Sequence, residues 1–262
     1  MSEFQDRDRA LSFGADARAY HRARPGYPAA LFEDLFAVAP PRPRVIEIGA
    51  GTGKATVELA SQSADVIAIE PDPSMAAVLT ETVSGARNVR IDISDFEHWI
   101  PPGAGCADLV ASAQAWHWVD PSVALPKVRE TLAPGGVFAV WWNRTRSVPG
   151  DLSEELQKVY LRFAPQMFDP GLSGELSPGS LAAVNVIRAS GKFAEPTVRV
   201  YPWERRSSAR AYVESLGTLS ASRQLSGEVR RKLFESIVQL IDDAGGSIAV
   251  GDQAELVMAR RD

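Results

Sequence analysis

Short apolar runs alternate with amphipathic stretches along the first part of this chain. The first, second and fifth of these runs are continuously hydrophobic, which is typical of strands covered on both faces. Strands that alternate with helices predict a parallel sheet with right-handed crossovers, and therefore an α/β fold. The predicted strands are 45–48, 66–70, 89–93, 108–112 and 137–142, and the predicted helices are about 54–62, 73–83 and 123–132.

The pattern changes after a tight turn at 133–136 and the fifth strand, so that the alternation ends near Asn143. Two amphipathic helices are predicted there, each opening on a capping residue, together with two more strands. We expect this part to complete the sheet and to place helices above its C-terminal edge, as an elaboration of one domain. The predicted features are helices at 151–163 and 226–243 with caps Asp151 and Ser226, a segment rich in Pro and Gly at 165–180, helices around 203–223, and strands at 197–201 and 254–259.

The first strand runs directly into glycines that alternate with other residues. Glycine adopts positive φ angles and lets the backbone approach a ligand closely. A triphosphate loop needs G-x-x-x-x-G-K-[ST], but Gly49 and Gly53 are one residue too close and Lys54 is followed by Ala55. A dinucleotide loop needs a third glycine where this chain has Lys54. S-adenosylmethionine is the third ligand class that uses such a turn.

An acidic residue follows the second strand at a spacing that suits an adenosine ligand. Glu70 lies 21 residues after Gly49, and ligands of open α/β sheets bind outside the carboxyl ends of the strands, where the strand order reverses. A carboxylate there accepts hydrogen bonds from both ribose hydroxyls. NAD enzymes and methyltransferases share this acid, so Glu70 supports adenosine without choosing the cofactor.

The glycine turn resembles the first motif of the class I S-adenosylmethionine-dependent methyltransferases, E-x-G-x-G-x-G, through Glu47, Gly49, Gly51 and Gly53. Later motifs of that family follow in order. Two further segments resemble a small-molecule subgroup that includes trans-aconitate methyltransferase-like proteins. The resemblance implies a doubly wound, mostly parallel seven-stranded sheet of the Rossmann-like methyltransferase fold, with a helical C-terminal elaboration over the active site. The later motifs are 66–72, 92–97 with 108–120, and 132–143. The two further segments are 112–120 and 24–28.

The same resemblance implies which residues bind S-adenosylmethionine. Asp95 takes the adenine amino group and the backbone N–H of Phe96 meets the ring, with Asp92 as the alternative acid. Tyr20 or Arg24 closes over the methionine end, where the guanidinium is able to meet a carboxylate. The complete set of expected cofactor residues is Tyr20, Arg24, Glu47, Gly49, Gly51, Gly53, Glu70, Pro71, Asp95, Phe96 and Gln114.

His117 is the candidate catalytic residue, because it follows the fourth strand at the ligand edge and titrates near neutrality. A general base is needed only if the accepting atom must lose a proton. The alternative is a packed histidine between Trp116 and Trp118. The helices around 203–223 are expected to shape the acceptor pocket, and Arg223 is a guess for an anchor of an acidic acceptor.

Composition and charge limit the classes of partner and cofactor that the sequence predicts. The net charge of −5 gives no reason to expect a nucleic acid, the only cysteine is Cys106, and no signal peptide or membrane span is visible. The three histidines have no metal-binding spacing, so we expect no metal site. Composition thus favours a cytoplasmic protein, and the resemblance implies an enzyme that transfers a methyl group to a small molecule by in-line displacement.

Two rival functions stay open at this point: a catalytically silent S-adenosylmethionine-binding protein, and a nicotinamide-dependent oxidoreductase. The acceptor, the methylated atom and the oligomeric state are also open. The expected organisation is a single domain, with a covering segment at 1–40, a cofactor-binding core at 41–145, and acceptor-pocket helices with the last strands at 146–262.

Overall fold

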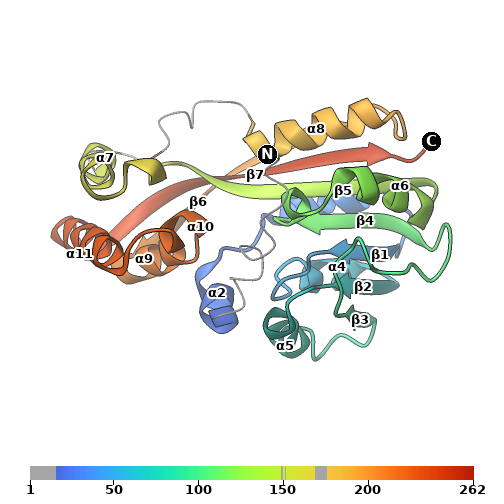
Figure 1. Cartoon of the computed structure of the whole chain (residues 1–262), viewed down its shortest axis with the longest axis horizontal. Coiled ribbons are helices and arrows are strands. Elements are labelled where there is room, and N and C mark those ends of the chain that lie inside the picture. Colours follow the sequence, from blue (N-terminus) through green and yellow to red (C-terminus); the bar gives the residue numbers. More distant parts are fainter. Residues whose placement is uncertain (1–15, 149, 151, 169–175) are drawn as a thin grey trace.

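The structure is a computed structural model that describes residues 16–148, 150, 152–168 and 176–262. Within them seven strands form one sheet in the order β3-β2-β1-β4-β5-β7-β6 (Figure 1). Strands β1 to β5 are parallel, and β7 is antiparallel to both of its neighbours. The α/β prediction is confirmed. The strands are β1 (Arg44–Ile48), β2 (Asp65–Ile69), β3 (Val89–Asp92), β4 (Ala107–Ala113), β5 (Leu132–Ser147), β6 (Thr197–Ser208) and β7 (Ser247–Arg260).

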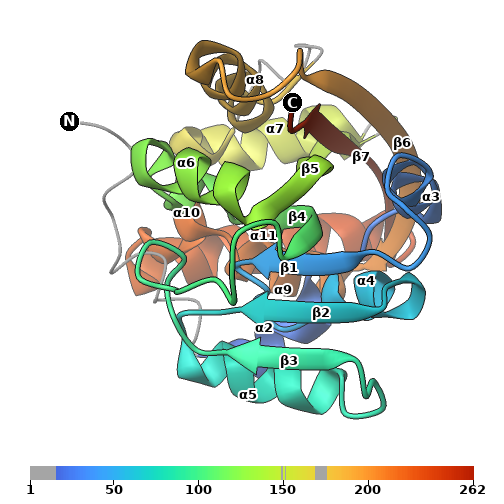
Figure 2. The same ribbon diagram turned by 90° about the vertical axis from the view of Figure 1, so that its right-hand side faces the viewer.

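Helices cover both faces of the sheet, as expected for a doubly wound fold (Figure 2). On one face, Leu31, Leu35 and Leu59 pack against the sheet, and on the other face Leu125 and Ile187 do so. The helices on the first face are α3 (Ala29–Ala37), α4 (Thr56–Gln62) and α5 (Pro73–Thr82), and those on the second are α6 (Pro121–Thr131) and α8 (Pro178–Ser190).

The helix starts follow signals that the sequence contains. Asp72 accepts the backbone N–H groups of Ser74 and Met75, and α5 begins at Pro73, whose missing N–H costs nothing in the first turn. The chain reverses its strand order between β1 and β4. The loop that follows β1 therefore lies at the position where open α/β sheets bind their ligands.

Strand β5 is longer than predicted at both ends. The expected tight turn at 133–136 is an irregularity inside the strand, because the register passes from Ala107 opposite Leu132 to Leu109 opposite Val137. The extra residues leave no room for a side chain at Gly136, where a Cβ would lie 2.9 Å from the Ala133 carbonyl oxygen. The strand also continues past the predicted end near Asn143, to residue 147, because β7 pairs with it along this length.

Two predictions for the C-terminal part are wrong. Residues 203–208 are not helical but form the end of β6, where each residue pairs with β7, from Trp203 opposite Asp252 to Ser208 opposite Ser247. Helix α8 was not predicted, although its sequence carries the signals: Ser177 caps it, and Gly191 ends it with a φ of 59°. Because the segment before the helix is rich in Pro and Gly, the sequence pattern there is typical of a loop and gave no prediction of a helix.

Further helices gather beyond the carboxyl ends of the parallel strands, as predicted (Figure 1). Three of them form an apolar cluster with the start of β7 that includes Leu156, Tyr212, Leu233 and Ile248. The predicted cap Ser226 is confirmed, whereas Asp151 lies outside the described residues. None of the described helices is long and apolar enough to cross a membrane. The helices of the cluster are α7 (Leu152–Phe163), α9 (Ala209–Gly217) and α11 (Gly227–Asp243), and the other helices of this end are α2 (Ala17–Ala23) and α10 (Ser220–Arg223), with the 3₁₀ turn η4 (Pro165–Met167).

Candidate functional site

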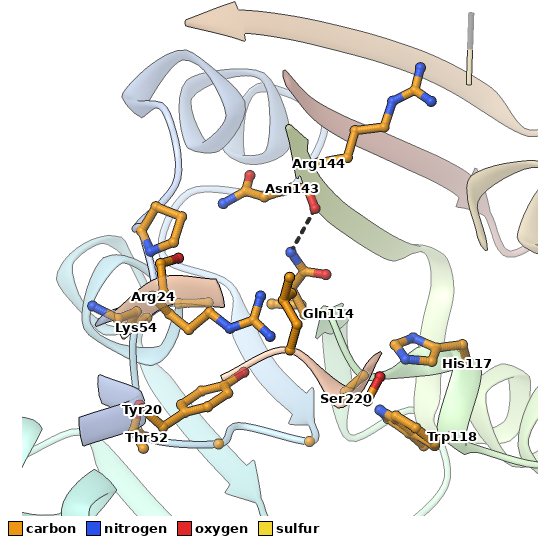
Figure 3. Close-up of a pocket in the computed structure, with 18 of the residues that line it drawn as sticks. Tyr20, Arg24, Thr52, Lys54, Gln114, His117, Trp118, Asn143, Arg144 and Ser220 are labelled. Atoms are coloured by element: carbon orange, nitrogen blue, oxygen red, sulfur yellow. Dashed lines mark hydrogen bonds between the residues drawn. The ribbon is translucent and has the colours of Figure 1, made fainter. Parts of the chain in front are cut away.

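A cavity of about 1140 Å³ opens at the carboxyl ends of the parallel strands. One half is lined by the glycine loop, the ends of β2 and β4, and the segment after α2. The other half is lined by the end of β5 and by α7, α9 and the chain around them. Figure 3 shows Tyr20, Arg24 and Lys54 on one side of this space, His117 and Trp118 on the opposite side, and Gln114 between them. The cavity therefore joins the glycine turn to the C-terminal helices.

The glycine loop uses its three glycines in different ways. Gly51 has a φ of 59°, and a Cβ there would meet only the Met75 side chain, at 3.9 Å, so this backbone is open to the cavity. Gly49 lies against the loop after β4, since its Cβ would come within 2.3 Å of the Ala115 Cβ. Gly53 does not line the cavity; a Cβ there would lie 2.8 Å from Leu79 of α5.

Glu70 connects the end of β2 to the glycine loop. Its carboxylate accepts the backbone N–H of Gly51 at 2.7 Å and that of Asp72 at 2.9 Å. Burial raises the pKa of Glu70 to about 7, against the lowering effect of these two hydrogen bonds. Glu70 and the adjacent Pro71 both line the cavity.

Glu47 lies deeper, at the end of β1, and is fully buried. It accepts a hydrogen bond from the Thr56 hydroxyl at 2.6 Å, and its Oε1 has no partner among the described residues. Burial raises the pKa of Glu47 to about 8, and the hydrogen bond from Thr56 opposes this rise. The carboxyl group thus connects the end of β1 to the first turn of α4, and Glu47 is among the residues that line the cavity.

The loop after β3 brings Asp95 and Phe96 to the cavity. The alternative acid, Asp92, does not line it and instead accepts hydrogen bonds from Arg90 and from the Trp99 indole. Lys127 of α6 fixes this loop, because its ammonium group donates to the carbonyl oxygens of residues 96, 97 and 99. Of the two acids that the sequence offered, only Asp95 therefore reaches the cavity.

Gln114 stands at the end of β4 with a φ of 58°, a left-handed conformation that is uncommon for a residue other than glycine. Its backbone N–H donates to the Trp141 carbonyl at 2.9 Å, and its side chain donates to the Asn143 carbonyl at 3.1 Å. These bonds hold the side chain between the two halves of the cavity (Figure 3).

Helix α2 and the residue that follows it, Arg24, cover the glycine loop. His21 is hydrogen bonded to the Thr52 hydroxyl at 2.9 Å, and the Arg24 guanidinium lies over the Tyr20 ring and donates to the Thr218 carbonyl at 3.2 Å. The Arg24 Nε is buried without a hydrogen-bond partner among the described residues. Other atoms of Arg24 line the cavity, so this unused donor lies just behind the cavity wall.

His117 lies in the short 3₁₀ turn η3 (Trp116–Trp118) after β4. Trp116 turns into the core against Phe138, whereas His117 and Trp118 line the cavity with their rings 4.6 Å apart. The histidine is therefore not packed between the two tryptophans. Its Nδ1 accepts a hydrogen bond from the Trp142 indole at 3.2 Å.

The second half of the cavity combines arginines with apolar and aromatic side chains. Arg144 pairs with Glu255 at 2.8 Å and Arg205 with Asp252 at 2.5 Å, so carboxylates within the protein balance these two charges. The sequence predicted the part of this wall that comes from 203–223, but not residues 143–146, which extend β5 beyond its predicted end at the ligand edge. Its lining includes Asn143, Arg144, Thr145, Arg146, Leu156, Tyr160, Met167, Arg205, Tyr212, Leu216 and Asp252.

Arg223, the guessed anchor for an acidic acceptor, is not among the residues that line the cavity. Asn143 is, and its side-chain amide donates to the Gly26 carbonyl at 2.7 Å while its Oδ1 is buried without a hydrogen-bond partner among the described residues. Within the same described ranges, no group of three or more His, Cys, Asp or Glu side chains is arranged to hold a metal ion.

The chain is similar to known methyltransferases in both sequence and fold. Residues 46–140 match a protein family described as a methyltransferase domain. An uncharacterized methyltransferase of Mycobacterium tuberculosis is 40% identical over 137 residues, which are 52% of this chain and 54% of the relative. A trans-aconitate 2-methyltransferase of Variovorax paradoxus is 32% identical over 113 residues, 42% of each chain. The matches thus span about half the length of these curated relatives.

Solved structures extend the likeness of the fold to nearly the whole chain. A protein of Anaeromyxobacter dehalogenans assigned as a type II methyltransferase has a TM-score of 0.67 and 22% identity, over 91% of this chain and 97% of that chain. The phosphoethanolamine N-methyltransferase 2 of Haemonchus contortus, in complex with S-adenosylhomocysteine, has a TM-score of 0.55 and 18% identity, over 100% of this chain and 60% of that chain. Residues 46–140 of this chain therefore form a methyltransferase domain, which contains the glycine turn and lies in a sheet with the fold of known methyltransferases.

Proposed function

We propose that this protein transfers a methyl group from S-adenosylmethionine to a small-molecule acceptor. The observation that carries the proposal is the continuous cavity, which has the glycine loop and Glu70 in one half and arginine and tyrosine side chains in the other. A donor in the first half and an acceptor in the second would meet beside Gln114 and His117.

The residues of the first half fit an adenosine ligand that carries an amino acid. Gly51 offers backbone that a side chain would otherwise obstruct, and the Glu70 carboxylate suits a ribose diol. The buried Arg24 Nε, which has no hydrogen-bond partner among the described residues, suits the methionine carboxylate. Asp95 lies on the loop after β3, at the place expected for the adenine amino group.

S-adenosylmethionine supplies an activated methyl group on a sulfonium, so the protein is left mainly with the task of positioning. Correct orientation of two bound reactants accounts for about 7–11 kcal/mol of barrier in favourable cases. The rigid elements that provide it here are the end of β4 with Gln114 and the end of β5 with Asn143, linked by the hydrogen bond from the Gln114 amide to the Asn143 carbonyl. The segment with Tyr20 and Arg24 excludes water above the donor half.

The second half of the cavity supports a small acceptor. Its walls mix apolar and aromatic groups such as Leu156 and Tyr160 with the guanidinium groups of Arg144 and Arg146. A pocket of this composition suits a compact molecule with an apolar part and a polar or anionic part. The net charge of −5 favours neither a nucleic acid nor an anionic membrane as partner, and we propose a cytoplasmic location and a single-domain organisation.

The test is transfer of a labelled methyl group from S-adenosylmethionine to a panel of small acids, phenols and amines, with binding of S-adenosylhomocysteine measured by calorimetry in parallel. Binding together with transfer to a panel member supports the proposal. Binding without transfer to any compound favours a catalytically silent binding protein, and absence of binding contradicts the cofactor assignment.

A further inference from the structure

The hydrogen bond between Trp142 and His117 has a fixed direction. An indole nitrogen donates and never accepts, so the His117 Nδ1 that lies 3.2 Å from it must offer a lone pair. A neutral imidazole carries one proton. The proton of neutral His117 is therefore on Nε2, and this nitrogen is a donor.

The indole that sets this arrangement is itself held by packing. Trp142 is buried in β5, and Gly179 in the first turn of α8 lies directly against its ring. A Cβ at position 179 would come within 3.3 Å of the indole Cε2 and 3.5 Å of its Nε1. The glycine thus lets the helix backbone approach the indole closely, and the indole in turn orients the histidine.

His117 occupies the part of the cavity where an acceptor would meet the donor. Its ring extends from the turn after β4 toward the middle of the cavity, beside Ser220 and Trp118 (Figure 3). Arg144 and Arg146 line the same cavity. A hydrogen-bond donor at this place complements an oxygen atom that bears negative charge or a lone pair.

We propose that His117 binds the methyl acceptor as a hydrogen-bond donor through Nε2, that Trp142 holds it in this tautomer, and that it is not the base of the reaction. The inference rests on the proposed methyl transfer. The Nδ1 lone pair of His117 is used by the Trp142 indole, so a base would have to receive the proton at Nε2, which already carries one. The acceptor class that follows is a molecule with a carbonyl or oxyanion group that accepts the hydrogen bond from His117. The nucleophilic atom of this molecule does not need the His117 ring to remove its proton.

The tautomer is measurable without any acceptor. With only three histidines in the chain, ¹⁵N–¹H correlation spectra of the S-adenosylhomocysteine complex resolve each ring, and His117→Gln assigns the signal of residue 117. We expect the wild-type ring to be protonated on Nε2 alone, and Trp142→Phe, which keeps an aromatic ring but lacks the N–H, to show a mixture of tautomers. A wild-type ring protonated on Nδ1 would overturn the proposal.

Kinetics test the role toward the acceptor, which is the compound of the panel that wild type methylates fastest. Gln places an amide N–H near the position of Nε2, whereas Leu has no donor. We therefore expect KM for the acceptor to rise about three- to tenfold in His117→Leu and less in His117→Gln, with the shape of the kcat against pH profile preserved in both. Loss of an acid limb of that profile in His117→Gln would identify the ring as a base and reject the proposal.

Failure of the proposed function gives a different result. If S-adenosylhomocysteine binds but no compound is methylated, the methyl transfer proposal fails, and with it the role of His117 toward an acceptor. The spectra of wild type and Trp142→Phe still decide whether Trp142 sets the tautomer. An altered affinity of Trp142→Phe for S-adenosylhomocysteine would show that the indole acts on the donor half, against the proposal.

Discussion

The carboxylate of Glu70 accepts the backbone N–H of Gly51 at 2.7 Å, so the end of β2 is tied directly to the glycine loop. A second hydrogen bond comes from the backbone of Asp72, which caps α5. One carboxylate therefore aligns the loop, the strand end and the next helix, and it lines the cavity at the same time.

Replacement of Glu70 by Gln should weaken binding of S-adenosylhomocysteine by about ten- to a hundredfold. The amide keeps one acceptor oxygen but loses the charge, and hydrogen bonds to charged groups contribute about 1.5–3 kcal/mol. Titration calorimetry measures the change. Glu58→Gln, which removes an exposed carboxylate from α4, is the control. Unchanged affinity in Glu70→Gln would show that this residue does not hold the ribose.

Glu47 should make the stability of the ligand-free protein depend on pH. Burial raises its pKa to about 8 from a usual value of 4.5, so the folded state holds this proton more tightly than the unfolded state does. The stabilising effect of the protonated carboxyl is fully present below the usual value and is lost as the pH rises through about 8. Glu70, with a pKa raised to about 7, acts in the same direction.

The variant Glu47→Gln isolates this contribution, since the amide stays neutral and still accepts from Thr56. Urea unfolding at about pH 5 and about pH 8 should show that the advantage of the variant over wild type increases with pH. Glu58→Gln, on the exposed side of α4, should show no such trend. A difference that stays constant with pH would mean that Glu47 is already ionised in the folded protein.

Arg24→Met should distinguish ligands that carry the methionine part from those that lack it. The Arg24 Nε is a buried donor without a hydrogen-bond partner among the described residues, and Met retains much of the side-chain volume. We expect the affinity for S-adenosylhomocysteine to fall about tenfold or more, and the affinity for 5′-methylthioadenosine to stay near that of wild type.

The exposed Arg22, in the last turn of α2 and two residues before Arg24, provides the matched control for that experiment, since Arg22→Met removes the same charge. Equal losses for both ligands in Arg24→Met would assign Arg24 to closing the covering segment through the Thr218 carbonyl, and not to the methionine carboxylate.

Gly53→Ala should lower the free energy of unfolding by about 1–3 kcal/mol. The position has a φ of 90°, and the added Cβ would lie 2.8 Å from Leu79 of α5. Gly85→Ala is the control, because nothing lies within 4 Å of its Cβ. Denaturant unfolding compares the two. Since Gly53 does not line the cavity, a variant that bound S-adenosylhomocysteine poorly but unfolded like wild type would contradict this assignment.

The donor half of the site was predictable from sequence because its residues directly follow strands that the hydrophobic pattern predicts. The ends of parallel strands meet at one edge of the sheet, so these residues lie close together. Glu70 and Asp95 are examples, each placed by the strand before it. The choice between Asp92 and Asp95 was not decided by sequence, since both flank the end of β3. Contacts of Asp92 with Arg90 and Trp99 turn it away from the cavity.

Apart from the stretch 203–223, the acceptor half was not predictable from the sequence, for a physical reason. The residues after Trp142 are polar, so the pattern gave no reason to extend β5, and only pairing with β7 keeps them in a strand. The same pairing makes residues 203–208 a strand in place of the expected helix. Tyr160 and Tyr212 meet in the cavity only because distant helices pack together. Such contacts leave no local signal.

The long pairing of β5 with β7 has a consequence for how acceptor size can change. Strand β5 carries Asn143 near the donor half and Arg146 further along. Each residue of the strand advances by about 3.3 Å, so the length of the paired strands sets the distance to the far wall of the cavity. An insertion of one residue pair into both strands would keep every side chain on its face and move the far wall outward by about 6–7 Å. We expect such an insertion to lengthen the acceptor half of the cavity while the glycine loop and Glu70 stay in place.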